Sequence, residues 1–129
     1  QERDVQLINQ TQDQLPGDPG LIRRALANLL AHALRYATPA SAVTVSSEVS
    51  QDTLEITVHN HGEPIAAEHL PLLFERFYRC DPSRNQPDDS GGLGLAIVRS
   101  IMQLHGGRVS VDSTEAGTSF HLEFPLGNA

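Results

Sequence analysis

The 129-residue chain contains no lysine, so all nine of its basic residues are arginines. The absence of lysine excludes a P-loop nucleotide site, which needs that side chain, and it excludes Schiff-base chemistry. The sequence also has no tryptophan and a single cysteine, Cys80. One cysteine cannot form an internal disulfide, which fits a protein from a reducing compartment.

Long apolar runs are absent as well. No stretch approaches the roughly 20 residues that a membrane-spanning helix needs, and the residues given do not show the pattern expected of a signal peptide. The net charge of −7 argues against nucleic acid or an anionic membrane surface as the main partner. The length suits one domain with a modest core. Because the chain begins at Gln1 rather than at a methionine, we expect it to be a piece of a longer protein.

The clearest pattern lies in residues 21–36, where apolar side chains recur every three or four positions, as on one face of a helix. Asp18 can cap the start of this helix, and Pro39 prevents its continuation. Its second stripe is polar, and such a stripe can either line a ligand site or face solvent. The polar residues that share this stripe are Asn28, His32 and Arg35.

Alternation of polar and apolar residues marks several short strands. The two central candidates form a hairpin, because a polar turn at residues 50–52 separates them. A second run of helical spacing, residues 93–105, ends at Gly106 and Gly107, which are typical of helix C-termini. The strands that the alternation predicts are residues 4–9, 42–49, 54–58, 108–112 and 119–124.

Between the hairpin and the second helix, residues 65–77 indicate a short helical turn, and residues 79–92 contain almost nothing apolar. A connection of that length without structure is usually a functional lid or is disordered. The resulting order of elements predicts an α/β (α+β) fold. We expect a two-layer sandwich, in which about three helices cover one face of a mixed, mostly antiparallel sheet of about five strands.

The run Gly91-Gly92-Leu93-Gly94-Leu95 lies at the junction of this polar segment with the second helix. Glycines let the backbone approach a ligand closely, and a helix N-terminus offers free N–H groups to an anion. A flexible hinge at the start of a helix is the alternative interpretation. The run is not a dinucleotide fingerprint, because no strand leads directly into it.

Four segments occur in one order: the Asn28 helix, Asn60-His61-Gly62 after a strand, residues 74–79, and residues 91–95. In this order and spacing they resemble the N, G1, F and G2 boxes of the ATP-binding catalytic domain of sensor histidine kinases. That domain has the Bergerat fold, which gyrase, heat-shock chaperone and mismatch-repair ATPases share. The resemblance extends over essentially the whole chain and implies a single ATP-binding catalytic domain, residues 1–129.

Within the family, the sequence between the G1 and F boxes is most similar to the heavy-metal (copper/silver) sensor branch. The catalytic residues that the resemblance implies are Asn28, His32 and Arg84. Asn28 and His32 would hold Mg²⁺ against the triphosphate of ATP, and Arg84 would meet the γ-phosphate. Asn60 replaces the family's aspartate as the acceptor for the adenine amino group. The nucleotide-binding residues that the resemblance implies are Asn28, His32, Arg35, Tyr36, Asn60, Gly62, Ile65, Arg76, Arg79, Arg84, Gly92, Leu93, Gly94, Leu95 and Thr118.

The implied reaction is that of a histidine protein kinase. The γ-phosphoryl group of ATP passes to a histidine on a separate dimerisation domain and then to a response regulator, in heavy-metal signalling. None of the six histidines precedes an acidic residue, as the family's acceptor does, so the fragment should bind ATP without phosphorylating itself. The resemblance also implies a cytoplasmic domain of a homodimeric inner-membrane protein, without nucleic-acid partners or direct membrane contact.

Position 32 leaves alternatives open. The family has asparagine there, and Mg²⁺ prefers oxygen ligands to the imidazole of His32. A weakened nucleotide-binding or scaffold module, and an ATPase with water as acceptor, are therefore the competing hypotheses. We further expect the isolated domain to be a monomer, and residues 79–92 to become ordered with nucleotide. His59 and His61 are expected on opposite faces if the preceding strand continues to them, without a metal cluster.

Overall fold

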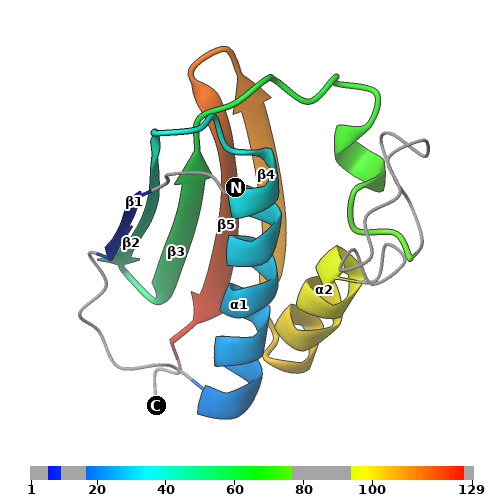
Figure 1. Cartoon of the computed structure of the whole chain (residues 1–129). Helices are drawn as coiled ribbons and strands as arrows, with labels where there is room; N and C mark the ends of the chain where they lie inside the picture. The colour runs from blue at the N-terminus through cyan, green and yellow to red at the C-terminus, as the bar shows by residue number, and fades with distance from the viewer. Residues whose placement is uncertain (1–5, 10–16, 77–93, 127–129) are drawn as a thin grey trace.

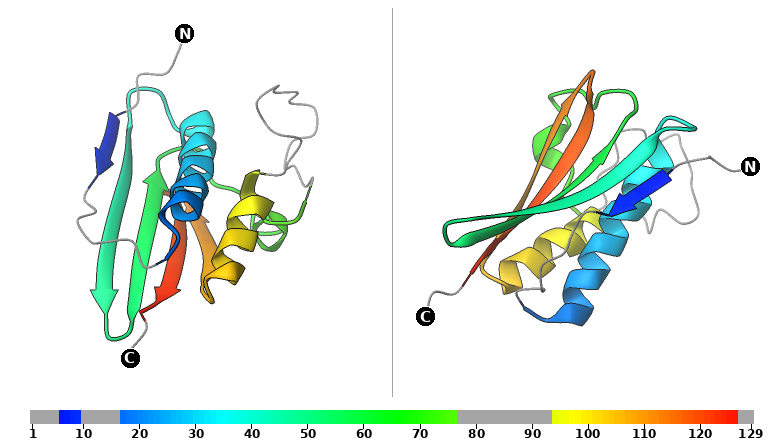
Figure 2. Two further views of the ribbon diagram at one scale, coloured as in Figure 1. Left: turned by 90° about the horizontal axis from the view of Figure 1, so that it is seen from below. Right: turned by 90° about the vertical axis from the view of Figure 1, so that its left-hand side faces the viewer.

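The computed structural model describes residues 6–9, 17–76 and 94–126. Five strands form one sheet in the order β1-β2-β3-β5-β4, and α1 and α2 both lie on one of its faces (Figures 1 and 2). Strands β1 and β2 are parallel, and the other neighbours are antiparallel. The elements are β1 (Gln6–Asn9), α1 (Pro19–Tyr36), β2 (Ala42–Ser50), β3 (Thr53–Asn60), the 3₁₀ helix η1 (Leu70–Leu72), α2 (Gly94–Leu104), β4 (Arg108–Thr114) and β5 (Gly117–Pro125).

This architecture confirms the predicted two-layer α/β sandwich with a mixed, mostly antiparallel sheet. The helical layer of the described residues consists of two α-helices and the single turn η1. No described helix combines the length and the apolar character that crossing a lipid bilayer requires. The expected lid, residues 79–92, lies outside the described residues.

Helix α1 begins as its sequence predicts. The carboxylate of Asp18 accepts hydrogen bonds from the backbone N–H groups of Gly20 and Leu21, at 2.9 and 3.1 Å. The expected apolar face was too wide, because Leu34 is 42% exposed. A helix that covers a sheet from one side buries only a narrow stripe. The residues of α1 that are buried are Ile22, Ala25, Leu29 and Ala33.

Helix α2 ends at a pair of glycines, as predicted. Gly106 has a φ of 70°, and its N–H bonds to the carbonyl of Gln103, while the N–H of Gly107 bonds to that of Met102. The next residue before the pair, His105, connects the two helices. Its Nε2 accepts a hydrogen bond from the backbone N–H of Asp18 at 3.1 Å. The C-terminal end of α2 is thereby fixed to the N-terminal end of α1.

The inner face of the sheet, which α1 and α2 cover, is apolar along most of its length. Alternate residues of β3 and β5 are fully or almost fully buried there: Leu54, Ile56, Val58, Phe120, Leu122 and Phe124. At one end of the same face the pattern continues with two polar residues, Asn60 on β3 and Thr118 on β5. This polar end of the inner face is the candidate position of a ligand site.

Candidate functional site

Two buried polar side chains lie side by side at the end of the inner face. Asn60 and Thr118 are register partners on β3 and β5, and they are only 3% and 4% exposed. The Asn60 amide donates from Nδ2 to the carbonyl of His61 at 3.2 Å. Within the described part of the chain its Oδ1 accepts no hydrogen bond. A buried acceptor of this kind normally has a partner, so Oδ1 is suited to receive a donor from a ligand.

Thr118 belongs to a short hydroxyl network. Its Oγ1 lies 2.7 Å from Oγ of Ser113 on β4, and the same Ser113 oxygen accepts the backbone N–H of Ile65 at 2.8 Å. Ile65 lies in the segment between β3 and η1, and its side chain packs against the core. Strand β4, strand β5 and this segment therefore meet beside Asn60.

The C-terminal end of α1 contacts the same segment. The backbone N–H of Thr38 bonds to the carbonyl of His61 at 2.8 Å. A Cβ atom at Gly62 would overlap the carbonyl oxygen of Tyr36, so this position requires glycine. The predicted site residues Tyr36 and Gly62 are thus adjacent. The carbonyl oxygen of Tyr36, at the end of α1, lies where a side chain at position 62 would be.

Asn28 connects the first helix to the second. Its Nδ2 donates to the carbonyl oxygen of Gly94 at 3.3 Å, which leaves the amide oxygen Oδ1 for another partner. Gly94 is the first residue of α2, and the following Leu95 is buried in the core. The structure therefore brings together the predicted residues Asn28, Gly94 and Leu95.

His32 lies one turn after Asn28 and packs against aromatic rings. Its ring centroid is 5.2 Å from that of Phe120, in an edge-on arrangement, and 4.8 Å from that of Tyr36. Phe120 also contacts Phe74 edge-on, with ring centroids 6.0 Å apart. The buried ring of Phe120 therefore lies between His32 on α1 and Phe74, which follows η1. Aromatic contact is thus one described role of the His32 imidazole.

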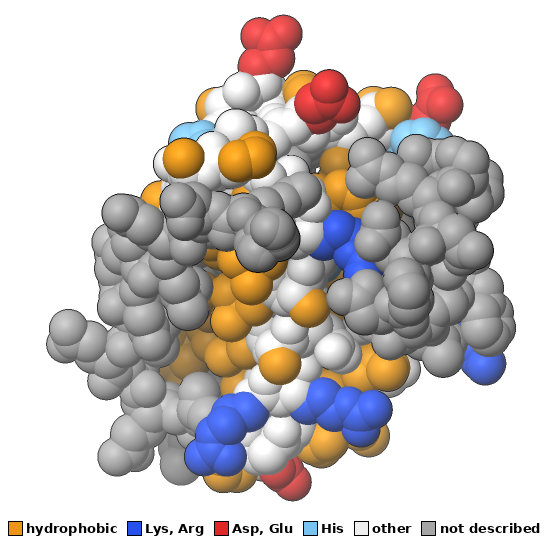
Figure 3. Space-filling view, viewed as in Figure 1, with side chains coloured by type: hydrophobic (Ala, Val, Ile, Leu, Met, Phe, Trp, Pro, Cys, Tyr) orange, Lys and Arg blue, Asp and Glu red, His pale blue; other side chains and the backbone are white. Residues whose placement is uncertain are grey.

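Arginines gather on the helical face of the molecule (Figure 3). Arg76, a predicted site residue, lines a groove between α1 and α2 together with Arg24 and Arg99. Arg99 also pairs with Glu75 at 3.3 Å. Arg35 lies in the last turn of α1, where a cation is favoured by the helix dipole. The predicted site residues outside the described part are Arg79, Arg84, Gly92 and Leu93.

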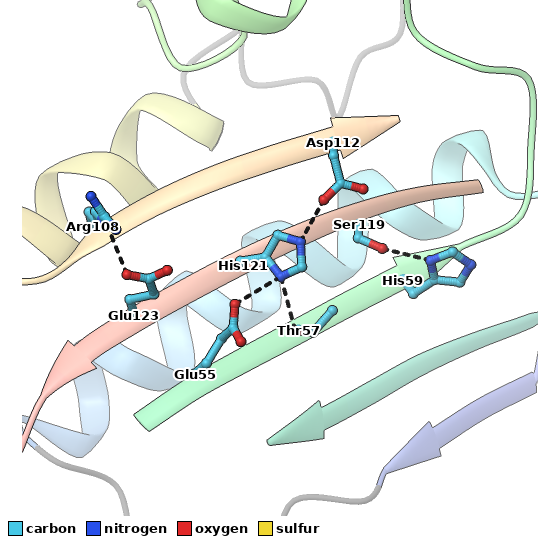
Figure 4. Close-up of polar contacts among 8 residues, drawn as sticks. All are labelled: Glu55, Thr57, His59, Arg108, Asp112, Ser119, His121 and Glu123. Carbon is cyan, nitrogen blue, oxygen red and sulfur yellow. Dashed lines mark hydrogen bonds and ion pairs between the residues drawn. The ribbon is translucent and has the colours of Figure 1, made fainter. Parts of the chain in front are cut away.

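The opposite face of the sheet is polar (Figure 4). There, Nε2 of His121 lies 2.8 Å from the carboxylate of Asp112, and its Nδ1 lies 3.2 Å from that of Glu55. The same Nδ1 is 3.1 Å from the hydroxyl of Thr57. His121 thereby connects β3, β5 and β4 on the face that is remote from Asn60. Arg108 and Glu123 add an ion pair of 2.8 Å between β4 and β5.

The expectation that His59 and His61 lie on opposite faces was wrong. Their rings are 5.1 Å apart. Residues two apart along an extended backbone point to the same side, and His61 directly follows the end of β3 at Asn60. His59 Nδ1 lies 2.8 Å from Ser119 Oγ. Burial, together with the nearby His61, lowers the pKa of His59 below 6.5. Among the described residues, no group of three or more His, Cys, Asp or Glu side chains could hold a metal.

Ser113 contacts the candidate site through Thr118, and the sequence interpretation did not predict it. Val109, Val111 and Ser113 occupy successive inner-face positions of β4. A serine that continues an apolar alternation toward the covered face was the available signal. The predicted strand ended at residue 112, so this position was not assigned to a strand.

Comparison with known proteins agrees with this arrangement. The family model for histidine kinase-, DNA gyrase B- and HSP90-like ATPases matches residues 17–128. Sensor histidine kinase CusS of Escherichia coli O157:H7 is 49% identical over 112 residues, which are 87% of this chain and 23% of that protein's length. The sequence matches therefore concern one part of a longer relative.

Solved structures give the same result. Mycobacterial sensor histidine kinase MprB superposes with a TM-score of 0.79 and 30% identity, over 95% of this chain and 82% of that one. Full-length ShkA, solved in complex with AMPPNP, has a TM-score of 0.79 and 25% identity, over 97% of this chain and 26% of that one. The chain belongs to the histidine kinase-, DNA gyrase B- and HSP90-like ATPase family, and its relatives there are the catalytic domains of sensor histidine kinases.

Proposed function

We propose that this chain is a single catalytic domain that binds ATP with its adenine against Asn60 and Thr118. The observation that supports this most directly is the buried Asn60 side chain, whose Oδ1 accepts no hydrogen bond from the described residues. The amino group of adenine is a donor that this oxygen can accept. Thr118, its register partner, supplies a hydroxyl beside it. Ile65 and Gly62 hold the segment next to these two side chains.

The triphosphate would extend toward the end of α2 that follows the glycine-rich run. Asn28 fits Mg²⁺ there, because its Nδ2 is engaged with Gly94 and its oxygen, a hard ligand, remains available. Mg²⁺ would neutralise phosphate charge when it is bound with ATP. Arg35 and Tyr36 at the end of α1, and Arg76, are the described residues proposed to meet the phosphates and the sugar. We propose contact with the phosphates also for Arg79, Arg84, Gly92 and Leu93.

The proposed reaction passes the γ-phosphoryl group to a histidine of a separate dimerisation domain, for relay to a response regulator. The family match and the similarity to CusS support this assignment. We place the chain in the cytoplasmic part of a homodimeric inner-membrane protein of the heavy-metal sensor type. Phosphoryl transfer depends on positioning and on charge neutralisation, so the domain's part is to hold ATP in one orientation.

Calorimetric titration with ATP tests the binding part of the proposal. Asn60→Leu keeps the size of the side chain and removes the acceptor, so it should weaken ATP binding by about tenfold or more. Gln103→Leu, which removes an exposed amide on α2, is the matched control and should leave the affinity unchanged. Equal ATP affinity of the Asn60→Leu variant and the wild-type chain would refute the assignment of the adenine site.

A second experiment tests the reaction. Labelled ATP is mixed with this chain and with the helical dimerisation domain of a related kinase, supplied in trans. Formation of phosphohistidine supports the kinase. Release of phosphate alone identifies an ATPase. ATP binding without either product identifies the weakened nucleotide-binding or scaffold module, which the imidazole at position 32 favours because Mg²⁺ prefers oxygen ligands.

A further inference from the structure

The side-chain amide of Asn60 is held in one orientation by a backbone group. An amide can accept through Oδ1 or donate through Nδ2, so an asparagine in a ligand site can recognise either kind of partner if it is free to turn. Here Nδ2 donates to the carbonyl of His61 at 3.2 Å. Because a carbonyl only accepts, turning the amide over would lose this bond and place Oδ1 against another oxygen. Asn60 is 3% exposed, so bulk water does not replace a bond that is lost there.

The carbonyl of His61 is in turn held by the end of α1. The backbone N–H of Thr38 donates to this carbonyl at 2.8 Å, so two donors share its two lone pairs. The next residue, Gly62, lies against the carbonyl oxygen of Tyr36. The end of α1 therefore fixes the backbone to which the Asn60 amide is bonded. Oδ1 remains without a donor from the described residues.

This fixed acceptor distinguishes purine bases by the group at one ring position. Adenine carries an amino group there, which donates to Oδ1 of Asn60. A 6-oxopurine carries an oxygen at the same position, so two buried acceptors would face each other. An unsubstituted purine loses the bond without this repulsion. The hydroxyl of Thr118 can donate or accept, so it suits both the N1 of adenine and the N1–H of a 6-oxopurine. The difference between the bases therefore rests on Asn60.

We propose that the end of α1 is a positioning element for the base: the N–H of Thr38 holds the His61 carbonyl, which keeps Asn60 an acceptor and makes the domain discriminate against 6-oxopurine nucleotides. This inference rests on the proposed function, because it requires the base to lie at Asn60. Thr38 acts through His61 and Asn60 and does not itself touch the base. Its influence should therefore appear in the choice between bases.

The first test compares three nucleotides by calorimetry with the wild-type chain: ATP, purine riboside triphosphate, which has no group at the position of the amino group, and ITP, which has an oxygen there. ATP should bind most tightly and ITP most weakly, with about tenfold or more between them. An Asn60 amide that is free to turn would donate to the oxygen of ITP. ITP binding as tightly as the unsubstituted purine, or more tightly, would therefore overturn the inference.

The second test removes the N–H group of residue 38. Ala37 has φ −73° and ψ 146°, an extended conformation that suits the residue before a proline, so Thr38→Pro fits the backbone at this point. The variant should lower the ATP to ITP affinity ratio by about threefold to tenfold, because the His61 carbonyl is no longer held. Thr38→Val keeps the N–H and changes only an exposed side chain, so it should retain the wild-type ratio.

Circular dichroism shows whether the Thr38→Pro variant folds. If it does not, an ester in place of the peptide bond between residues 37 and 38, introduced by semisynthesis, removes the same N–H without a proline ring and should lower the ratio similarly. A wild-type ratio in whichever of the two folds would overturn the role of α1. Failure of the wild-type chain to bind ATP would instead overturn the proposed function, and this inference with it.

Discussion

The side-chain amide of Asn28 donates a hydrogen bond to the carbonyl oxygen of Gly94, and this bond joins α1 to the first residue of α2. The donor is the NH₂ end of the amide, so the oxygen end is directed to other partners. One side chain thus has two tasks, a structural one through nitrogen and a proposed ligand role through oxygen.

Separate substitutions can distinguish these two tasks. Asn28→Asp keeps an oxygen ligand but loses the donor to Gly94, so it should lower the melting temperature while Mg²⁺–ATP still binds. Asn28→Ala loses both, and Mg²⁺–ATP affinity should fall by about tenfold or more. Calorimetry and thermal melts measure the two effects, with Gln103→Ala on the exposed side of α2 as the control. Undiminished Mg²⁺–ATP binding by Asn28→Ala would contradict the ligand role.

Replacement of His32 by asparagine should increase Mg²⁺–ATP affinity. An amide oxygen suits Mg²⁺ better than an imidazole nitrogen does, and a gain of about 1–2 kcal/mol corresponds to roughly tenfold tighter binding. The variant also loses the ring contact with Phe120, so its melting temperature should decrease slightly. Titrations with and without Mg²⁺, at two pH values, measure the change. The hypothesis of a metal-ligand defect is wrong if Mg²⁺–ATP binds the variant no more tightly at either pH.

Substitution of Gly62 by alanine should destabilise the domain by about 1–3 kcal/mol, measured as the free energy of unfolding in urea. The new Cβ would overlap the carbonyl oxygen of Tyr36, and a backbone atom cannot avoid it by a side-chain rotation. Gly94→Ala provides the matched control for stability, because nothing lies within 4 Å of its Cβ position. Comparable free energies of unfolding for the two variants would show that the end of α1 can shift at little cost.

The stability of the domain should decrease in mild acid through His59. Burial is the main reason that the pKa of this histidine is lowered below 6.5, and the neighbouring His61 adds to it, against opposing effects of the Ala116 backbone and of Asp112. Below about pH 6.5 the unfolded chain therefore binds more protons than the folded chain at this position, and the free energy of unfolding falls as the pH falls.

Thermal melts at pH 7.5 and 5.5 test this prediction. His59→Asn removes the titrating group and keeps a donor near Ser119, so its melting temperature should depend less on pH than that of the wild-type chain. Thr44→Val, which alters the cross-strand neighbour of His59, is the control and should retain the wild-type pH dependence. Identical pH dependence in all three proteins would exclude His59 as the source.

Periodicity predicted the elements well, because helices and strands repeat with different periods. It predicted the strand at residues 54–58 too short, since β3 continues to the buried polar Asn60 through pairing with β5. Alternation assigns a residue to a face but not to a neighbour. The contact between Ser113 and Thr118 follows from the register of two strands, and it could not be read from the sequence.

Motif spacing similarly supplied a set of candidate site residues, whose roles stay predictions, but it did not indicate which of them touch. The structure adds that Asn28 contacts Gly94 and that Tyr36 lies against Gly62. Such contacts depend on how α1 lies across the sheet, which no local pattern determines. The assignment of Arg84 to the γ-phosphate stays a prediction, because that residue lies outside the described part of the chain.

The last strand of the described residues, β5, is not at an edge of the sheet but between β3 and β4. During synthesis β3 emerges early, and its second hydrogen-bonding edge has no partner until β5 has left the ribosome. Thr118 lies on that strand, so a nascent chain that ends before Gly117 lacks both the central strand of the sheet and one residue of the proposed adenine site. The domain can therefore complete its fold only after β5 has been synthesised. Premature termination yields a chain with an exposed strand edge, which favours aggregation.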